Sequence, residues 1–278
     1  MKTFLKDLIF LNYRLLKSKY YSGKNNPKTG ISDKERIRVL SPKYIENNSA
    51  NLFETQFFYT SGTAFIHSLD EIFSENIYKF STSSEKPYII DCGANIGLSI
   101  LYFKKQYPNA EIDAFEPDKN IFSVLQKNIE NFCNDNLVRA HERAVWKEET
   151  ELDFFSDGGL SGSTILDFSH TNTTNKVQTA DLKKYLNRPV DFLKIDIEGA
   201  ENDLIFDLQG HLSNVKHFFL EYHGIKDSPQ NLGEILNLLK NEGFEYYIRV
   251  AGETITYPFC GDRPKNYNQQ LNILCYRK

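Results

Sequence analysis

The sequence predicts an α/β protein in which a mostly parallel sheet carries helices on both faces. Three observations support this prediction. After residue 87, short apolar runs alternate with amphipathic helical segments. A glycine-containing turn, "CGANIG", follows the first apolar run. Acidic side chains close several of the runs, at the carboxyl edge where open parallel sheets bind ligands.

Length and composition limit the classes of protein that this chain can represent. The chain has 278 residues and 40% hydrophobic content, enough for one large domain and a smaller appendage. The net charge of -4 gives no broad basic surface, so we expect no nucleic-acid partner. The four cysteines have neither CxxC nor zinc-ligand spacing, which indicates reduced thiols in a cytoplasmic protein.

The N-terminal region, residues 1–85, differs from the larger domain that we expect over 86–278. Apolar residues recur at helical spacing over 1–20, and residues 1–28 carry seven basic side chains against one acidic side chain. The segment has too many charges to span a membrane and lacks a signal-peptide cleavage site. We expect an amphipathic helix that either packs within a monomer or homo-oligomer or lies peripherally on the anionic inner face of a membrane.

The remainder of the N-terminal region is predicted to form a small cap or lid. Residues 22–50 are rich in Ser, Asn, Lys and Pro, as in connecting segments. Two short strands are expected around a turn at Ser61 and Gly62. Ser68 and Glu71 have capping-box spacing, which predicts a helix that starts at Ser68.

The larger domain is predicted to contain seven strands, over 88–92, 111–115, 137–141, 191–196, 216–222, 244–250 and 270–276. Helices are expected to start near Asn95, Asp118, Ala180, Glu201 and Gln230. The segment that joins the last two strands is too irregular for a crossover helix. It favours an antiparallel final strand that forms a reversed hairpin at the edge of the sheet.

The turn after the first strand indicates the kind of ligand. Gly93, Asn95 and Gly97 give GxNxG instead of the GxGxxG of dinucleotide sites, and Asp91 closes the strand beside them. A carboxylate there suits a cationic or zwitterionic ligand such as S-adenosylmethionine (SAM) better than a pyrophosphate. Glu116 ends the second strand, where an acid accepts hydrogen bonds from ribose hydroxyls, a requirement that NAD and SAM share.

Two further expectations concern the same ligand. Arg143, Ala144 and Val145 follow the third strand and are expected beside the adenine. Because the backbone at Gly93 would approach the ligand, we expect a long side chain there to block SAM binding while the fold survives.

Two later strands bring the candidate catalytic residues. Lys194 and Asp196 lie on one face of the fourth strand, with Asp196 at the carboxyl edge, where it is also expected to contact the cofactor. A lysine within a central strand needs a partner, and Glu221 on the next strand is the candidate, for chemistry or for a structural ion pair. His223 is the first candidate for the general base, and Asp196 is the second.

Three side interpretations accompany these assignments. Asp196, Glu221 and His223 have the residue types to hold one Mg²⁺ or Mn²⁺ ion, which would lower the pKa of a bound hydroxyl, but the sequence favours a reaction without metal ligands. Glu201 is expected to act structurally at the start of a helix. The loop 156–164 is expected at the rim of the site.

Four motifs, "IIDCGANIGLS", "AFEPD", "VDFLKIDIEGAE" and "LEYHG", resemble those of the FkbM-type methyltransferases. The resemblance covers roughly residues 86 to 250 and implies a Rossmann-like SAM-dependent methyltransferase fold of seven strands, the last reversed. It implies that the turn holds the methionine end of SAM, that Glu116 holds the ribose and that Ala144 lies near the adenine; the turn residues are Asp91, Gly93, Asn95 and Gly97. It also implies O-methylation of sugars or natural products, including bacterial surface polysaccharides.

Two other functions share parts of this pattern. An NAD-dependent oxidoreductase for sugar nucleotides would use the same sheet and Glu116, although the middle glycine of its turn is missing. A non-catalytic SAM- or glycan-binding protein would bind SAM without turnover. A nucleic-acid methyltransferase is disfavoured, because no Asn-Pro-Pro-aromatic motif occurs.

Overall fold

The computed structural model describes residues 25–41, 48–133, 136–156, 162–163, 174–252, 255–262 and 267–277. The amphipathic helix expected over 1–20 lies outside the described residues. Within the described ranges, a helix with the length and hydropathy of a membrane span does not occur.

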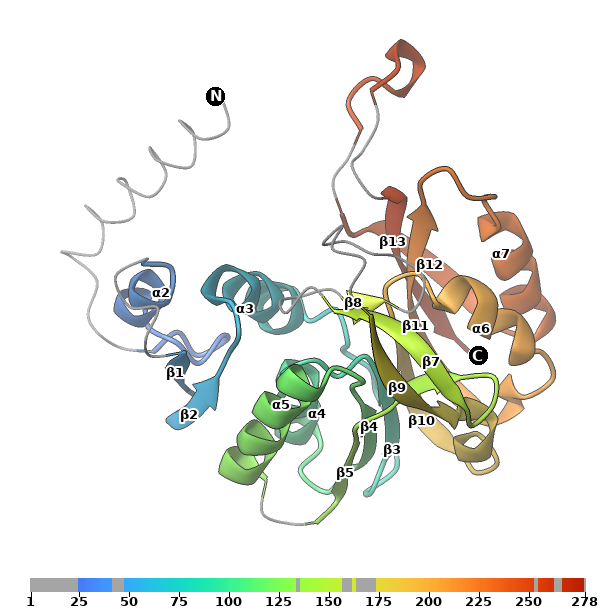
Figure 1. Cartoon of the computed structure of the whole chain (residues 1–278). Helices are drawn as coiled ribbons and strands as arrows, with labels where there is room; N and C mark the ends of the chain where they lie inside the picture. The colour runs from blue at the N-terminus through green and yellow to red at the C-terminus, as the bar shows by residue number, and fades with distance from the viewer. Residues whose placement is uncertain are drawn as a thin grey trace.

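A seven-stranded sheet forms the centre of the molecule (Figure 1). Its order is β12 (Glu245–Val250), β13 (Tyr267–Tyr276), β11 (Val215–Ile225), β10 (Val190–Ile195), β3 (Tyr88–Cys92), β4 (Glu111–Phe115) and β5 (Val138–His141). Every pairing is parallel except the two made by β13. This confirms the predicted Rossmann-like α/β sheet with a reversed last strand.

The last two strands, β12 and β13, form the predicted antiparallel pair at one edge of the sheet, with β12 outermost and β13 between it and β11. Burial explains this order. Strand β13 buries Leu271, Ile273 and Cys275, whereas none of the residues of β12 is fully buried. The more apolar strand therefore occupies the interior and the more polar strand forms the edge.

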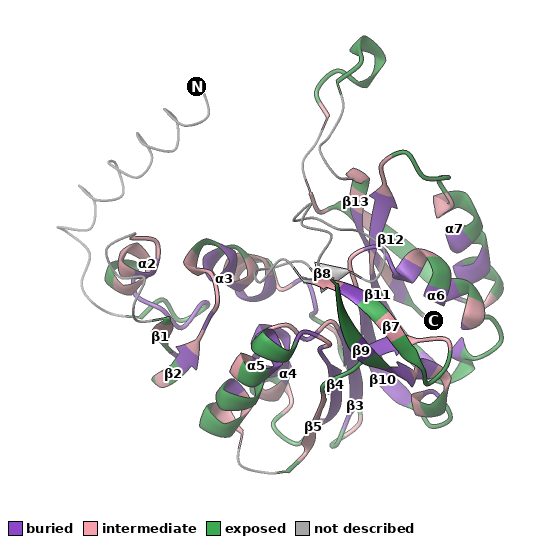
Figure 2. Ribbon diagram, in the orientation of Figure 1, coloured by how far each residue is buried: buried purple, intermediate pink, exposed green. Residues whose placement is uncertain are grey.

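Helices cover both faces of the sheet and create two cores. Helices α4 (Leu98–Gln106) and α5 (Lys119–Phe132) pack on one face, and α6 (Glu201–Asp207) and α7 (Leu232–Asn241) on the other (Figure 1). Consecutive residues of β3 alternate between them, since Ile89 belongs to the first core and Ile90 to the second. The central strands are buried on both faces (Figure 2), which accounts for their continuous apolar runs.

The predicted helix starts are correct in part. Asp118 caps α5 as expected, because its carboxylate accepts hydrogen bonds from the backbone N–H groups of Asn120 and Ile121. The first helix begins at Leu98, after Gly97 in a left-handed conformation. The helix expected near Ala180 is wrong, since the chain there forms β9 (Thr174–Asp181). Three short 3₁₀ segments are η3 (Leu182–Tyr185), η4 (Leu212–Asn214) and η5 (Pro258–Cys260).

A second, four-stranded sheet was not predicted. Its order is β6 (Ala144–Trp146), β9, β7 (Glu151–Ser156) and β8 (Gly162–Ser163). Strand β8 falls within the predicted rim loop 156–164, most of which lies outside the described residues. The new sheet matters for the site, because Phe154 and Val177 pack around Ala144 in a small apolar cluster.

The cap has a different construction from the predicted one. Strands β1 (Ser49–Leu52) and β2 (Thr55–Phe58) form a hairpin whose turn is Phe53–Glu54, both with positive φ. Ser61 is not in a turn between strands; its side chain caps α3 (Gly62–Leu69) by accepting the N–H of Ala64. Ser68 therefore lies inside a helix and starts none. A π-helix, η2 (Asp70–Ser74), follows α3, and α2 (Asp33–Val39) precedes the hairpin.

Asn128 of α5 fastens the cap to the larger domain. Its buried amide accepts the N–H of Phe58 at 2.7 Å, and donates to the carbonyl of Phe58 at 2.9 Å and to that of Ile96 at 2.8 Å. One hydrophobic core contains Phe65 of the cap together with Phe192 of β10. The division of the chain at residue 85 stays a prediction, but the cap packs directly on the sheet domain.

Gly93 begins the turn between β3 and α4, with φ of +83°. A Cβ atom at this position would lie 1.9 Å from the backbone oxygen of Asp196, which follows β10. The expectation that the fold survives a long side chain at Gly93 is therefore wrong. The protein's own backbone requires the glycine, because two neighbouring strand ends meet there.

We predict that Gly93→Ala lowers the free energy of unfolding by about 2–5 kcal/mol, from left-handed strain plus steric overlap. Gly210→Ala is the matched control, since Gly210 has φ of +80° and nothing within 4 Å of an added Cβ. We expect Gly210→Ala to lower the free energy of unfolding by about 1–2 kcal/mol, from backbone strain alone. Chemical denaturation of both variants measures the difference, and equal losses would contradict the overlap.

Candidate active site

A cavity of about 280 Å³ lies at the carboxyl ends of the central strands. Its wall combines the turn after β3, the ends of β4, β10 and β11, and part of the cap. Strands β3 and β10 are adjacent although far apart in sequence, so the cavity occupies the point where the strand order reverses. Open α/β sheets bind ligands at this position. Seven predicted site residues line the cavity: Gly93, Asn95, Glu116, Ala144, Lys194, Asp196 and Glu221.

Lys194 is buried, and its ion-pair partners differ from the predicted one. Its Nζ lies 3.4 Å from Asp91 Oδ1 and 3.3 Å from Asp196 Oδ2, and it donates to the backbone oxygen of Gly93 at 2.9 Å. Register explains why Glu221 was the wrong partner. Lys194 is level with Asp91 on β3 and with Phe219 on β11, so Glu221 lies two residues further toward the carboxyl edge.

Burial opposes the charge on Lys194, but Asp196 and the other acidic groups around it raise its pKa well above the usual range. It is therefore a fixed cation at neutral pH, and it does not serve as a proton acceptor.

Asp91 lies behind the turn and outside the cavity wall. Its side chain has no exposed surface, accepts a hydrogen bond from the Ser99 hydroxyl and pairs with Lys194. Gly97, at the start of α4, also lies outside the wall. Contact between SAM and these two residues stays a prediction. In this structure Asp91 pairs with Lys194, and Lys194 in turn donates a hydrogen bond to the backbone oxygen of Gly93 in the turn.

Glu116 faces the cavity from the end of β4. Its carboxylate accepts the N–H of Asn95 at 3.1 Å and that of Asp118 at 2.9 Å, which fixes it against the turn. Burial raises the pKa of Glu116 to about 7, despite the hydrogen bond from Asp118 that lowers it. Glu116 thus presents an oriented acid beside Asn95, as a ribose site requires.

The expected adenine end is apolar. Ala144 and Val145 line the cavity together with Phe115 and with Phe154 of the second sheet, and Arg143 stands beside them. Sequence reasoning missed Phe154, because β7 was not predicted and Phe154 follows Ala144 by ten residues without a motif. An apolar surface of this kind suits a purine ring.

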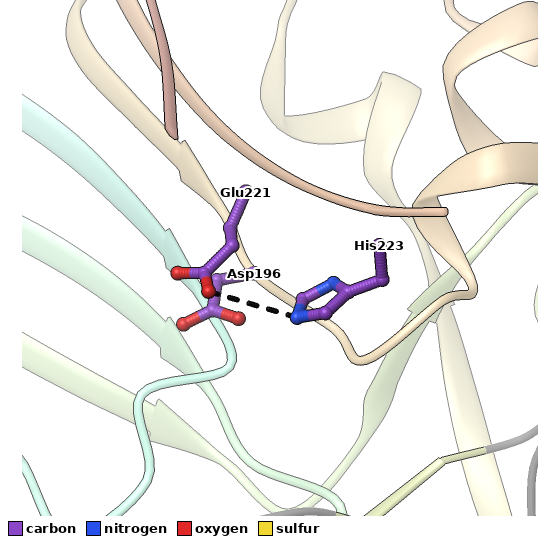
Figure 3. Close-up of side chains that lie close together, drawn as sticks. All are labelled: Asp196, Glu221 and His223. Carbon is purple, nitrogen blue, oxygen red and sulfur yellow. Dashed lines mark ion pairs between the residues drawn. The ribbon is translucent and has the colours of Figure 1, made fainter. Parts of the chain in front are cut away.

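Asp196, Glu221 and His223 meet as predicted, at the ends of β10 and β11 (Figure 3). The Nε2 atom of His223 lies 3.6 Å from Glu221 Oε1 and 3.5 Å from Glu198 Oε2. Burial raises the pKa of Glu221 well above its usual value, and the charge of Asp196 raises it further.

His223 is placed unfavourably for a general base. It has no exposed surface and is not part of the cavity wall. Burial lowers its pKa, but Glu201, whose Oε1 lies 3.0 Å from Nδ1, raises it, so that the pKa is about 10. An imidazole protonated at neutral pH cannot accept a proton from substrate. These observations correct the preference for His223 as the base.

Glu201 orients His223, in keeping with the structural role expected for it. Its buried carboxylate accepts the backbone N–H groups of Gly199 and His223, both at 2.8 Å, in addition to its contact with the imidazole. A carboxylate with these partners is fixed in place, and it fixes the ring beside it.

Two acidic wall residues were not predicted. Glu198 has a positive φ of 53°, rare for a residue with a side chain, and its Oε2 accepts a hydrogen bond from Tyr267 at 2.8 Å. Glu71 reaches the cavity from η2 of the cap, and burial raises its pKa. Glu198 lies within the motif "DIEGAE", which could have indicated it as a site residue. No sequence motif marks Glu71, because only the fold brings the cap over the strand ends.

The cavity is acidic as a whole. Its described wall contains three basic side chains, from His67, Arg143 and Lys194, and five carboxyl groups, from Glu71, Glu116, Asp196, Glu198 and Glu221. Lys194 is already compensated by Asp91 and Asp196. Such a wall attracts a cationic ligand and repels a pyrophosphate, because like charges in a partly buried site interact strongly.

Comparison with known proteins agrees with this geometry. The family model described as "Methyltransferase FkbM domain" matches residues 91–246. Methyltransferase 1 of Beauveria bassiana is 30% identical over 236 residues, which cover 76% of this chain and 89% of that protein. The 2-O-methyltransferase NoeI of Sinorhizobium fredii is 25% identical over 175 residues, 55% of this chain and 71% of that protein.

Among solved structures, the crystal structure of Methyltransferase FkbM from Methylobacillus flagellatus KT aligns with 98% of this chain and 60% of its own length, at 14% identity and a TM-score of 0.46. The family match covers more than half of the chain and includes the turn, Glu116 and the acidic ends of β10 and β11. The chain belongs to the FkbM family of SAM-dependent methyltransferases.

Proposed function

We propose that this protein is an O-methyltransferase that transfers the methyl group of SAM to a hydroxyl of a sugar or glycan, of the surface-polysaccharide or natural-product type. The observation that carries the proposal is the carboxylate cluster near the ends of β10 and β11, in the wall of the same cavity as Glu116. The relative named as a 2-O-methyltransferase supports oxygen as the acceptor atom.

The residues present fit SAM. Glu116 is oriented to accept ribose hydrogen bonds, Val145 and Phe154 offer an apolar surface, and the acidic wall matches a cationic sulfonium. When bound, SAM supplies a methyl group already activated by the positive charge on sulfur. NAD is the poorer ligand for this wall, because its pyrophosphate would face five carboxyl groups.

The protein then has two tasks, alignment and removal of a proton. The turn and the strand ends hold both reactants in line, an effect of order ~7–11 kcal/mol for well-oriented reactions. A positioned base adds about 10²–10⁴-fold. We assign the base role to Glu198, because it lines the cavity, is fixed by Tyr267 and holds a strained backbone conformation beside the cluster.

The acceptor itself can be tested in cells. Mass spectrometry of surface glycans with and without the gene should show the loss of one methyl group when the gene is absent. Purified protein that binds SAM but methylates none of a panel of hydroxyl acceptors would favour the non-catalytic alternative.

We predict that SAM affinity rises with pH through about 7. The carboxylate form of Glu116 accepts the ribose hydrogen bonds, and with a pKa of about 7 its share grows from about a tenth at pH 6 to about nine-tenths at pH 8. Calorimetry should therefore show about tenfold tighter binding at pH 8. In Glu116→Gln this increment should disappear, leaving the dependence due to SAM's own amino group. An identical pH profile in both proteins would contradict the role of Glu116.

We predict that Glu198→Gln lowers kcat by about 10²–10⁴-fold while the Kd for SAM changes little, because the amide cannot take the proton. Glu142→Gln serves as the control, since Glu142 is exposed and lies outside the cavity wall. Turnover should be followed as S-adenosylhomocysteine formed with a hydroxyl acceptor. Wild-type turnover in Glu198→Gln would exclude it as the base.

A further inference from the structure

We infer that Asp196, Glu221 and His223 form a binding site for one divalent cation in the wall of the cavity. Each residue contributes one ligand atom, and these atoms lie within 4.8 Å of one another. Figure 3 shows the carboxyl groups of Asp196 and Glu221 side by side, with a ring nitrogen of His223 directed toward them. This inference deepens the proposed function and rests on it.

The buried nitrogen of His223 is the observation that distinguishes this cluster from an ordinary acidic patch. Nε2 is inaccessible to solvent and has no hydrogen-bond partner among the described residues. The nearest carboxylate oxygens lie 3.5 and 3.6 Å away, too far for a good hydrogen bond. A buried polar atom without a partner is costly, and an ion between Nε2 and the carboxylates would take the place of the proton that the imidazole carries in the metal-free protein.

The other side of the ring has the arrangement that metal-binding histidines use. A ligating imidazole usually gives its second N–H to a carboxylate, which fixes the ring and directs the opposite nitrogen at the metal. Here Nδ1 lies 3.0 Å from Glu201 Oε1, and Glu201 is itself held by the N–H groups of Gly199 and His223. Glu201 is therefore a positioning residue for the proposed site.

The surrounding charge also favours a cation. Glu71 and Glu198 face the same part of the cavity as Asp196 and Glu221. The ammonium group of Lys194 is shared between Asp91 and Asp196. A divalent ion would bring further positive charge to this group of carboxylates.

The donor set indicates which cation to expect. One imidazole and two carboxylates mix nitrogen with oxygen, which suits Mn²⁺ better than Mg²⁺, an ion that prefers oxygen ligands and water. Ligand distances of about 2.1–2.2 Å would require the side chains to approach one another slightly on binding.

An ion held there would act directly on the acceptor. By binding the acceptor oxygen it would lower the pKa of the hydroxyl, while Glu198 beside it takes the proton. The O–C bond then forms as the C–S bond breaks, and the electron pair of that bond returns to sulfur, giving a methyl ether and S-adenosylhomocysteine. The ion is neither consumed nor oxidised in this step.

The test is a Mn²⁺ titration of the full-length protein after treatment with a chelator, with free Mn²⁺ followed by its electron paramagnetic resonance signal. We expect one Mn²⁺ per chain. Glu221→Gln, which keeps the shape of the side chain, should weaken binding at least about tenfold. Glu234→Gln is the control, because Glu234 is exposed on α7 outside the cavity.

A second variant guards against loss of folding. Replacement of His223 leaves Glu201 without its imidazole partner, so Asp196→Asn provides an independent ligand change, and circular dichroism checks each protein. SAM binding is measured separately by calorimetry. Absence of Mn²⁺ and Mg²⁺ binding with SAM binding intact would overturn the cation site alone, as would equal Mn²⁺ affinity in wild type and Glu221→Gln. Absence of SAM binding would overturn the proposed function, whatever Mn²⁺ does.

Discussion

The buried ion pairs of Lys194 fix the geometry on which the site depends. A lysine that is 2% exposed is tolerated only when carboxylates and carbonyl oxygens surround its ammonium group. Lys194 finds Asp91 on β3, Asp196 after β10 and the carbonyl of Gly93 in the turn. One side chain thus ties the ends of two strands to the loop between β3 and α4. Gly93 has no room for a side chain because this connection is so close.

The same arrangement sets the electrostatics of the cavity. Lys194 pairs with Asp91 and Asp196, while Glu198 and Glu221 face the cavity, where burial and the charge of Asp196 raise the pKa of both carboxyl groups. His223 stands behind them and is oriented by Glu201. Such a wall suits a cationic methyl donor, and its carboxyl groups suit the removal of a proton from the acceptor hydroxyl. The same cavity also contains the apolar surface of Val145 and Phe154.

Whether a feature could be predicted from the sequence depends on how far apart along the chain the interacting residues lie. The strands β3, β4 and β10 were predictable because each is an apolar run buried on both faces, and Asp118 because a helix cap is a local feature. The ion-pair partner of Lys194 was not predictable, since it depends on the register between β10 and β11. The adjacency of Asp196, Glu221 and His223 was predictable, because all three lie at or near the carboxyl ends of two strands expected to be neighbours.

The second sheet and the construction of the cap were not predicted, for other reasons. Strand β9 is largely exposed at its start and carries polar residues, so its pattern did not indicate a strand. The hairpin of the cap turns at Phe53 and Glu54, and neither position carries the Asn or Gly that usually marks such a turn. In each case a tertiary contact stabilises a conformation that the local residues do not prefer.

The cap completes the environment that Lys194 requires. Tyr78, which follows η2, packs edge-on against Phe219 and places its ring 5.9 Å from the ammonium group of Lys194. Glu71 accepts a hydrogen bond from Asn272 of β13, so the cap is attached to the sheet at the acidic end of the cavity. Asn128 attaches it again beside the turn. Lys194 and Asp91 are both buried, so this ion pair interacts through protein, where the attraction between opposite charges is strongest. The cap is therefore part of the same electrostatic unit as the strand ends.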